Sequence, residues 1–162
     1  MPEPVIVVIT SKICLGKCLE MSLADNKVGQ LWQSFMPLAR QISNRTNTEV
    51  LSVQVHPADY FEAFDPTKTF EKWAVVELTA VPSTIPEGMD ILVIPAGLYA
   101  VFHYKGLSSD SSIFRYIFND YLPASIYELD QRPHFEVLGD KYKNMDPNSE
   151  EDIYIPIRIK QQ

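Results

Sequence analysis

The chain has 162 residues, of which 46% are hydrophobic and 22% are charged, a balance typical of one globular domain covering residues 1–162. A formal net charge of −7 opposes direct binding to nucleic acid or to anionic lipid, and no apolar run approaches the ~20 residues of a membrane span. Because the N-terminus has no secretory signal, we expect a cytoplasmic protein with no nucleic-acid or membrane partner.

Hydrophobic periodicity predicts four regular elements in the first half, because apolar side chains repeat every 3.6 residues on a helix and every second residue on a strand. The β-branched run Val5–Ile9 is predicted to be a buried strand. Apolar residues at helical spacing then run from Val28 to Ile42, and Pro37 should kink or split this helix. The other predicted elements are strands at 51–55 and 70–80, with an irregular loop at 59–69 between them.

The second half repeats this order of elements after a turn at 82–88. Ser108 and Ser109 offer N-caps for a second helix, whose apolar face ends before Pro123. The strands predicted in this half lie at 91–95, 98–104, 134–138 and 152–160.

Each half therefore has the order strand, helix, strand, strand. The sequence predicts an α+β fold made of two such modules in tandem, with an antiparallel-rich sheet and both helices on one face. If the apolar strand faces meet the helices, the opposite face must be open to solvent or line a pocket. The residues expected on that opposite face are Trp73, Glu77, Tyr99, His103, Glu136 and Tyr154.

The sequence gives no sign of a metal or a cofactor. Cys14 and Cys18 form one pair without a second pair or a histidine at ligand spacing, so we expect reduced thiols. The acidic segment 140–152 does not have the spacing of a calcium loop and is expected to be a solvated connection. Nucleophile elbow, phosphate-loop and dinucleotide motifs are all missing from the sequence.

Several segments have a distinctive sequence: 61–64 (FEAF), 70–77 (FEKWAVVE), 95–102 (PAGLYAVF), 121–123 (YLP), 132–137 (RPHFEV) and 153–157 (IYIPI). Together they resemble the GyrI-like small-molecule-binding domain, the effector-binding domain of AraC-type and multidrug-responsive regulators. The resemblance covers nearly the whole chain and implies a free-standing member, since the sequence has no helix-turn-helix segment. It also implies a ligand cleft on the sheet face away from the helices.

The resemblance implies that Glu136 is the cleft carboxylate and that Tyr99 is the aromatic residue after the proline-glycine turn. Trp73 and Tyr154 match aromatic positions of the cleft, and Tyr142, in a loop, is a further candidate ligand contact. A carboxylate among aromatic rings is desolvated, which favours a cationic or hydrogen-bonding ligand. The competing interpretation is a solvated Glu136 with aromatic residues that only pack in the core.

Three functions follow from this resemblance. The first is a binding module for a small hydrophobic or cationic molecule, such as a drug. The second is a hydrolase that opens cyclopropane-containing electrophiles, with Glu136 as general acid or base and Tyr99 or Trp73 orienting the substrate. The third is a protein-binding role like that of gyrase inhibitors. The sequence leaves the ligand, any protein partner and the oligomeric state open.

Overall fold

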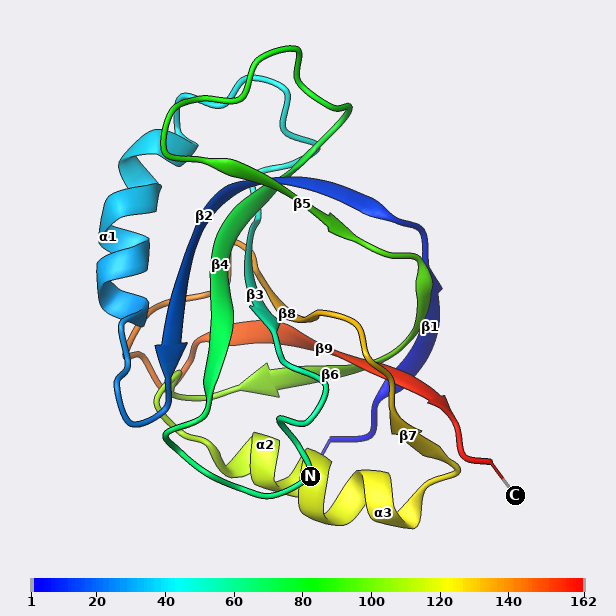
Figure 1. Ribbon diagram of the computed structural model, residues 1–162. Coiled ribbons are helices and arrows are strands. Elements are labelled where there is room, and N and C mark those ends of the chain that lie inside the picture. The colour runs from blue at the N-terminus through cyan, green and yellow to red at the C-terminus, as the bar shows by residue number, and fades with distance from the viewer. Residues whose placement is uncertain (1, 162) are drawn as a thin grey trace.

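A computed structural model describes residues 2–161 and shows an α+β fold dominated by antiparallel strands (Figure 1). The strands are β1 (Val5–Ile9), β2 (Lys12–Ser22), β3 (Val50–Val55), β4 (Thr69–Leu78), β5 (Asp90–Ile94), β6 (Gly97–Lys105), β7 (Tyr127–Leu129), β8 (His134–Leu138) and β9 (Glu150–Ile159). The helices are α1 (Val28–Ala39), α2 (Ser112–Arg115), the π-helical η1 (Tyr116–Tyr121) and α3 (Leu122–Ala124). Within residues 2–161, no helix is long and apolar enough to cross a membrane.

The sheet is strongly curved and resembles a barrel. Its strand order is β1-β6-β9-β8-β3-β4-β2-β5, with β7 added beside β9. Strands β1 and β2 follow one another with only residues 10 and 11 between them, yet they stand near opposite ends of this order. The same is true of β5 and β6, so the two ends of the sheet must curl toward each other, as Figure 1 shows.

The two predicted modules are present and are related by an approximate two-fold axis. Strand β2, helix α1 and strands β3 and β4 form the first module, and β6, the α2–η1–α3 segment, β8 and β9 form the second. The modules join where β3 pairs with β8, a ladder centred on Ser52 opposite Glu136. Strands β1 and β5 each extend the sheet of the other module, β1 beside β6 and β5 beside β2.

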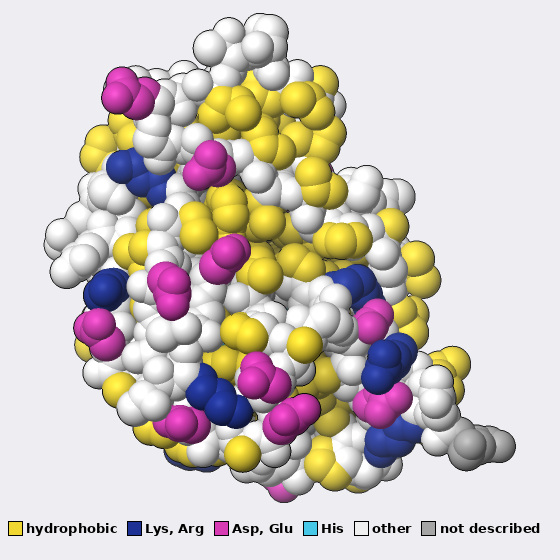
Figure 2. Space-filling model, viewed as in Figure 1, with side chains coloured by type: hydrophobic (Ala, Val, Ile, Leu, Met, Phe, Trp, Pro, Cys, Tyr) yellow, Lys and Arg dark blue, Asp and Glu magenta, His cyan; other side chains and the backbone are white. Residues whose placement is uncertain are grey.

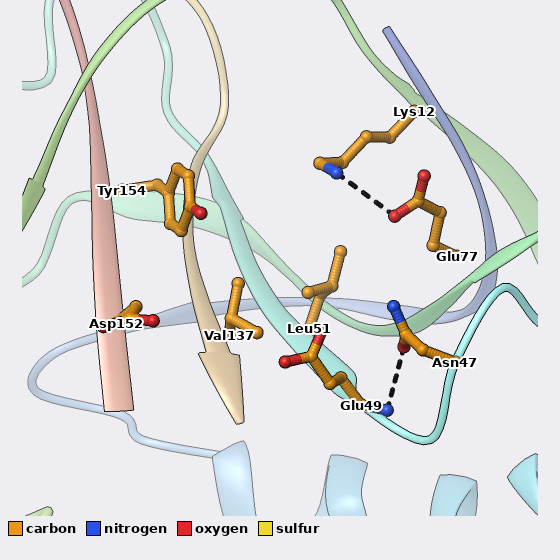
Figure 3. A pocket seen from close by; sticks show the side chains of 8 residues that line it. All are labelled: Lys12, Asn47, Glu49, Leu51, Glu77, Val137, Asp152 and Tyr154. Atoms are coloured by element: carbon orange, nitrogen blue, oxygen red, sulfur yellow. Dashed lines mark hydrogen bonds and ion pairs between the residues drawn. The ribbon is translucent and has the colours of Figure 1, made fainter. Parts of the chain in front are cut away.

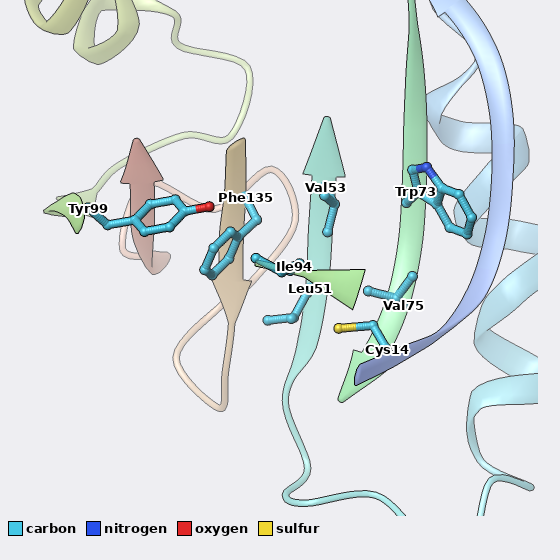
Figure 4. Close-up of a cluster of buried hydrophobic side chains, with 8 residues drawn as sticks. All are labelled: Cys14, Leu51, Val53, Trp73, Val75, Ile94, Tyr99 and Phe135. Atoms are coloured by element: carbon cyan, nitrogen blue, oxygen red, sulfur yellow. The ribbon is translucent and has the colours of Figure 1, made fainter. Parts of the chain in front are cut away.

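Both helical segments cover the outer face of the curved sheet, as predicted. Two separate apolar clusters lie beneath them, one including Leu31, Phe35 and Ala74 under α1, the other including Ile113, Ile117 and Ile153 under α2 and η1. A third cluster fills the inner face: Cys14, Leu51, Val53, Trp73, Val75, Ile94, Tyr99 and Phe135 (Figure 4). The face away from the helices is therefore packed with side chains over most of its area.

The prediction for the first strand was wrong in two respects. Val5–Ile9 is a strand, but it lies at one end of the strand order, with Val8 78% exposed. Figure 2 shows hydrophobic side chains gathered where β1 and β5 run.

The first strand of the module is β2, which the sequence analysis missed. The middle of β2 is buried on both faces and contains Gly16, so apolar and polar residues do not alternate cleanly along it.

The helices also differ from their predicted limits. Helix α1 ends at Ala39, two residues after Pro37, rather than continuing to Ile42. The second helix begins at Ser112, where Asp110 Oδ1 accepts a hydrogen bond from the main-chain N–H, so neither predicted serine caps it. Its middle turns are π-helical, and Pro123 lies inside the final turn.

Gly16 allows β2 and β4 to approach closely. A Cβ atom at this position would overlap the main-chain oxygen of Ala74 and lie 2.7 Å from Val75 Cα. Main-chain atoms of a central strand cannot move aside cheaply, so Gly16→Ala should destabilise the fold by more than about 2 kcal/mol, measured by urea unfolding. Gly29→Ala, in α1 with no atom within 4 Å of the added Cβ, is the matched control and should leave stability unchanged or raise it. Equal stability of the two variants would contradict this packing.

Candidate ligand-binding site

Glu136 lies on the outer, helix-covered face of the sheet, at the seam between the two modules. On β3 it stands opposite Ser52, and on β9 it stands opposite Ile153. Ser52 also stands opposite Ala74, which packs under α1, whereas Ile153 packs under the second helical segment. Figure 1 shows the two helical segments apart from each other on this face, and Glu136 comes from the strand between their two apolar clusters.

This position corrects the prediction that Glu136 shares a face with Tyr99 and Tyr154. In the β8–β9 ladder, Phe135 is opposite Tyr154, so Tyr154 belongs to the inner face and Glu136 to the outer one. The prediction assigned faces by alternation within each strand. Which residues of two strands share a face depends on the register between them, and the sequence pattern did not reveal that register.

Two further charged side chains lie near Glu136 on the outer face. They are Lys72 on β4, only 8% exposed, and Glu151 on β9, which is half-buried. With its amide oriented to satisfy both neighbours, Gln54 accepts a hydrogen bond from Lys72 Nζ and donates one to the carbonyl of His134, at 3.2 Å. Among the described residues, Lys72 forms no salt bridge with either carboxylate, although its charge acts on both.

Burial raises the pKa of Glu136, and the positive charge of Lys72 only partly offsets this rise. Burial also raises the pKa of Glu151 to about 8, and the negative charge of Glu136 adds to the effect. Burial lowers the pKa of Lys72, which the two glutamates partly restore. The carboxylate of Glu136 has no hydrogen-bond donor among the described residues, so nothing but Lys72 at a distance compensates its charge.

An aromatic cluster adjoins the carboxylates on the same face. His134, two residues before Glu136, stacks on Phe61 with ring centroids 5.3 Å apart, and Phe61 stacks on Phe118 of η1 at 5.4 Å. The ring of His56 contacts His134 at 4.7 Å, and its Nδ1 is buried without a hydrogen-bond partner. Tyr60 and Phe70 complete the cluster.

The two histidines of this cluster carry no charge near neutral pH. Burial lowers the pKa of His56 to about 4 and that of His134 to about 3. They therefore act as neutral ring surfaces, and the cluster offers no positive charge that would repel a cation. Phe61 is 43% exposed and comes from the loop before β4, so one loop side chain bridges the seam from His134 to η1.

Of the predicted aromatic contacts, only Tyr142 lies near Glu136. It is half-buried in the loop between β8 and β9, beside Ser108. Burial raises the pKa of Tyr142, and the charges of Glu151 and Glu136 raise it further. A phenol that keeps its proton can donate a hydrogen bond to a ligand or to a carboxylate.

Tyr99 and Trp73 lie on the inner face, where their polar atoms form hydrogen bonds within the protein (Figure 4). Tyr154 packs against the same cluster. Tyr99 is fully buried and donates its hydroxyl to the carbonyl of Pro133 at 2.8 Å. Trp73 is 8% exposed and donates its indole N–H to Glu71 Oε1 at 3.0 Å. The ring of Tyr154 stacks on Phe135, with centroids 4.4 Å apart.

A small polar cavity of about 140 Å³ opens on the inner face, at one mouth of the barrel (Figure 3). It is lined by Lys12, Asn47, Glu49, Leu51, Glu77, Val137, Asp152 and Tyr154. Lys12 Nζ forms an ion pair with Glu77 Oε1 at 3.1 Å, which neutralises part of the lining. In the described part of the chain, His, Cys, Asp and Glu side chains form no group of three that could hold a metal ion.

Sequence reasoning missed Lys72, Glu151 and the two histidines as parts of the seam. Lys72 and Glu151 lie on long strands whose side chains point alternately to the two faces of the sheet. A charged residue in such a strand is usually exposed to solvent, so neither was predicted to be buried. One signal was available: Lys72 interrupts the outer-face series that continues with Ala74, Val76 and Leu78. A charge within an otherwise apolar strand face indicates a buried polar group that has a structural or binding role.

The model of the GyrI-like small molecule binding domain matches residues 2–158. The chain belongs to this family. The transcriptional regulator BrlR of Pseudomonas aeruginosa is 30% identical over 141 residues, which cover 84% of this chain. The matched part of the chain spans about half of the length of this relative, namely 48%.

Solved structures share the fold of this GyrI-like chain. SAV2435 bound to tetraphenylphosphonium superposes with a TM-score of 0.71 at 14% identity and covers 96% of this chain and 94% of its own. A hydrolase from Listeria innocua gives a TM-score of 0.59 at 10% identity, covering 97% of this chain and 93% of its own. At such low identity these two structures establish the fold alone.

The ionised form of Glu136 should destabilise the free protein. A carboxyl group whose pKa is raised on folding binds its proton more tightly in the folded state, so stability is lost as pH rises from the unfolded pKa through the folded one. Glu136→Gln should therefore leave stability nearly unchanged at pH 5 and raise it by on the order of 1 kcal/mol at pH 9. Thermal unfolding across this range measures the effect, with the exposed Glu87→Gln as control. A variant less stable than wild type at pH 9 would show that Lys72 outweighs burial.

Proposed function

We propose that this GyrI-like domain binds a small lipophilic cation beside Glu136, between the outer face of the sheet and the helical layer. The observation that carries the proposal is a half-buried carboxylate at the junction of the two modules, with no hydrogen-bond donor among the described residues. Buried polar groups in folded proteins are normally paired, and unpaired ones with shifted pKa values concentrate at functional sites. A cation would supply the missing partner.

The surroundings of Glu136 support the lipophilic part of this assignment. Phe61, Phe118 and the neutral rings of His56 and His134 present aromatic faces and edges next to the carboxylate. A cation over an aromatic face gains roughly 0.5 to 2 kcal/mol, and apolar substituents gain further free energy by leaving water. A flat or multi-ring cation would take the place of the Phe61 side chain against His134.

The predicted site residues divide into two roles in this proposal. Glu136 and Tyr142 contact the ligand, the first through its charge and the second through its hydroxyl group. Tyr99, Trp73 and Tyr154 hold the inner face of the sheet and thereby fix the strands that carry Glu136. We place the domain in the cytoplasm and propose that it senses or sequesters its ligand, as an effector-binding unit.

The pair of carboxylates favours hydrolysis as a second candidate function. Burial raises the pKa of Glu136 and that of Glu151, the latter to about 8, and the charge of Lys72 partly offsets the rise at each group. Two neighbouring carboxyl groups, one protonated and one ionised, can serve as general acid and general base, the chemistry needed to open a strained ring such as a cyclopropane. Incubation with a cyclopropane-containing alkylator followed by mass spectrometry decides this point: an added water supports hydrolysis, and an unchanged compound leaves binding alone.

Titration calorimetry with tetraphenylphosphonium tests the binding proposal and locates the site. Wild-type protein should bind this cation, and Glu136→Gln should weaken the affinity at least about tenfold, because this substitution removes the charge of a buried carboxylate beside the aromatic cluster. The matched control is Glu49→Gln, which neutralises a carboxylate of the inner-face cavity and should leave Kd unchanged.

The reverse result, with Glu49→Gln weakened and Glu136→Gln unaffected, would move the ligand to the mouth of the barrel. Equal affinity of all three proteins would show that the charge of Glu136 does not contribute to binding. Absence of binding by the wild type would contradict the lipophilic cation as ligand class.

A further inference from the structure

The approximate two-fold axis relates two charged positions on either side of Glu136. Ala74 stands opposite Ser52, and Ile153 stands opposite Glu136. Lys72 precedes Ala74 by two residues on β4, and Glu151 precedes Ile153 by two residues on β9, so both point to the outer face at equivalent places. The first module thus supplies an ammonium group where the second supplies a carboxyl group.

Glu151 lies in a different environment from the other acidic residues of its strand. The neighbouring Glu150 and Asp152 point to the opposite face and bind the exposed imidazole of His103, each at 2.8 Å. Glu151 is half-buried and has no hydrogen-bond donor among the described residues. Three charged groups act on Glu151: Glu136 from β8, Lys72 from β4 and Asp152 from its own strand. Two tyrosines are also near it, Tyr142 from the loop between β8 and β9 and Tyr104, which stands opposite it on β6.

The cluster holds one ammonium group and two carboxyl groups, and it is only partly exposed to water. Burial raises the pKa of Glu151 to about 8, so this carboxyl group keeps its proton near neutral pH. Adding a cation to a half-buried cluster without removing a positive charge is costly in a medium of low polarity. The charge balance is restored if one acidic proton leaves as the cation enters.

We propose that Glu151 is a second ligand-binding carboxylate and that the site takes up a monovalent lipophilic cation in exchange for the proton of Glu151. The O–H bond of the carboxylic acid breaks, the proton passes to water or buffer, and the carboxylate that remains faces the bound cation. The net charge of the cluster is the same before and after binding. This inference rests on the proposed function, because it concerns the same site.

The test measures tetraphenylphosphonium binding to the whole chain between pH 6 and pH 9, since the charge of this probe does not change with pH. Affinity of the wild type should rise by on the order of a hundredfold over this range, because at high pH no proton has to be removed before the cation binds. At pH 7, calorimetry in buffers of different ionisation enthalpy should show the release of nearly one proton per cation bound. The neutral analogue triphenylphosphine oxide should bind without this dependence on pH.

Glu151→Gln separates the proton exchange from general effects of pH. Glutamine mimics the protonated acid, so the variant should match wild type to within about twofold at pH 6 and bind the cation on the order of a hundredfold more weakly at pH 9, with no proton released. Glu150→Gln, on the adjacent residue facing the other side of the sheet, should retain the wild-type pH profile. The buffer experiment on the wild type needs no variant and decides the question even if Glu151→Gln does not fold.

The outcomes distinguish the proton exchange from the proposed cation binding. Tight binding by the wild type with a flat pH profile and no proton release would overturn the exchange and leave the proposed function standing. A pH dependence that persists in Glu151→Gln would assign the proton to another group and equally overturn it. Absence of binding at every pH would overturn the proposed function, and the exchange with it.

Discussion

The pairing of β3 with β8 is the constraint on which the rest of the structure depends. This ladder joins the two modules, and its central pair, Ser52 and Glu136, lies between the apolar clusters under the two helical segments. A shift of one residue would turn Glu136 into the barrel and place Phe135 on the outer face, because side chains alternate along a strand. The register therefore determines both the core and the position of the Glu136 carboxylate at the seam.

The inner and outer faces of the sheet satisfy their polar groups to different degrees. On the inner face, the polar atoms of Tyr99 and Trp73 have partners at ordinary hydrogen-bond distances, and the cluster around them is closed. On the outer face, Glu136 has no hydrogen-bond donor within residues 2–161, and its burial costs free energy. Proteins tolerate such local costs chiefly at functional sites. The inner face thus stabilises the sheet that holds the outer face in this costly arrangement.

The sequence predicted the modules and the apolar helix faces well, because both depend on periodicity within one element. Leu31 and Phe35 pack under α1, and Ile117 packs under the second helical segment, as their spacing indicated. The face of Glu136 relative to Tyr154 could not be predicted from periodicity, because it depends on the register between strands. The resemblance to the family, and not the pattern, singled out Glu136. Tyr142 lies in a loop, where no periodicity exists to place it.

The absence of a direct salt bridge between Lys72 and Glu136 in residues 2–161 is compatible with the proposed cation site. Elsewhere in this chain a partly buried charge is held directly, as when Arg132 Nε binds Asp130 Oδ2 at 2.9 Å. Lys72 instead donates to Gln54 and acts on Glu136 only through its field. In the proposed site, an incoming cation would have no salt bridge to Glu136 to break among the described residues, and the free energy lost by leaving Glu136 unpaired would be regained on binding. A direct pair would have stabilised the free protein and weakened binding by the same interaction.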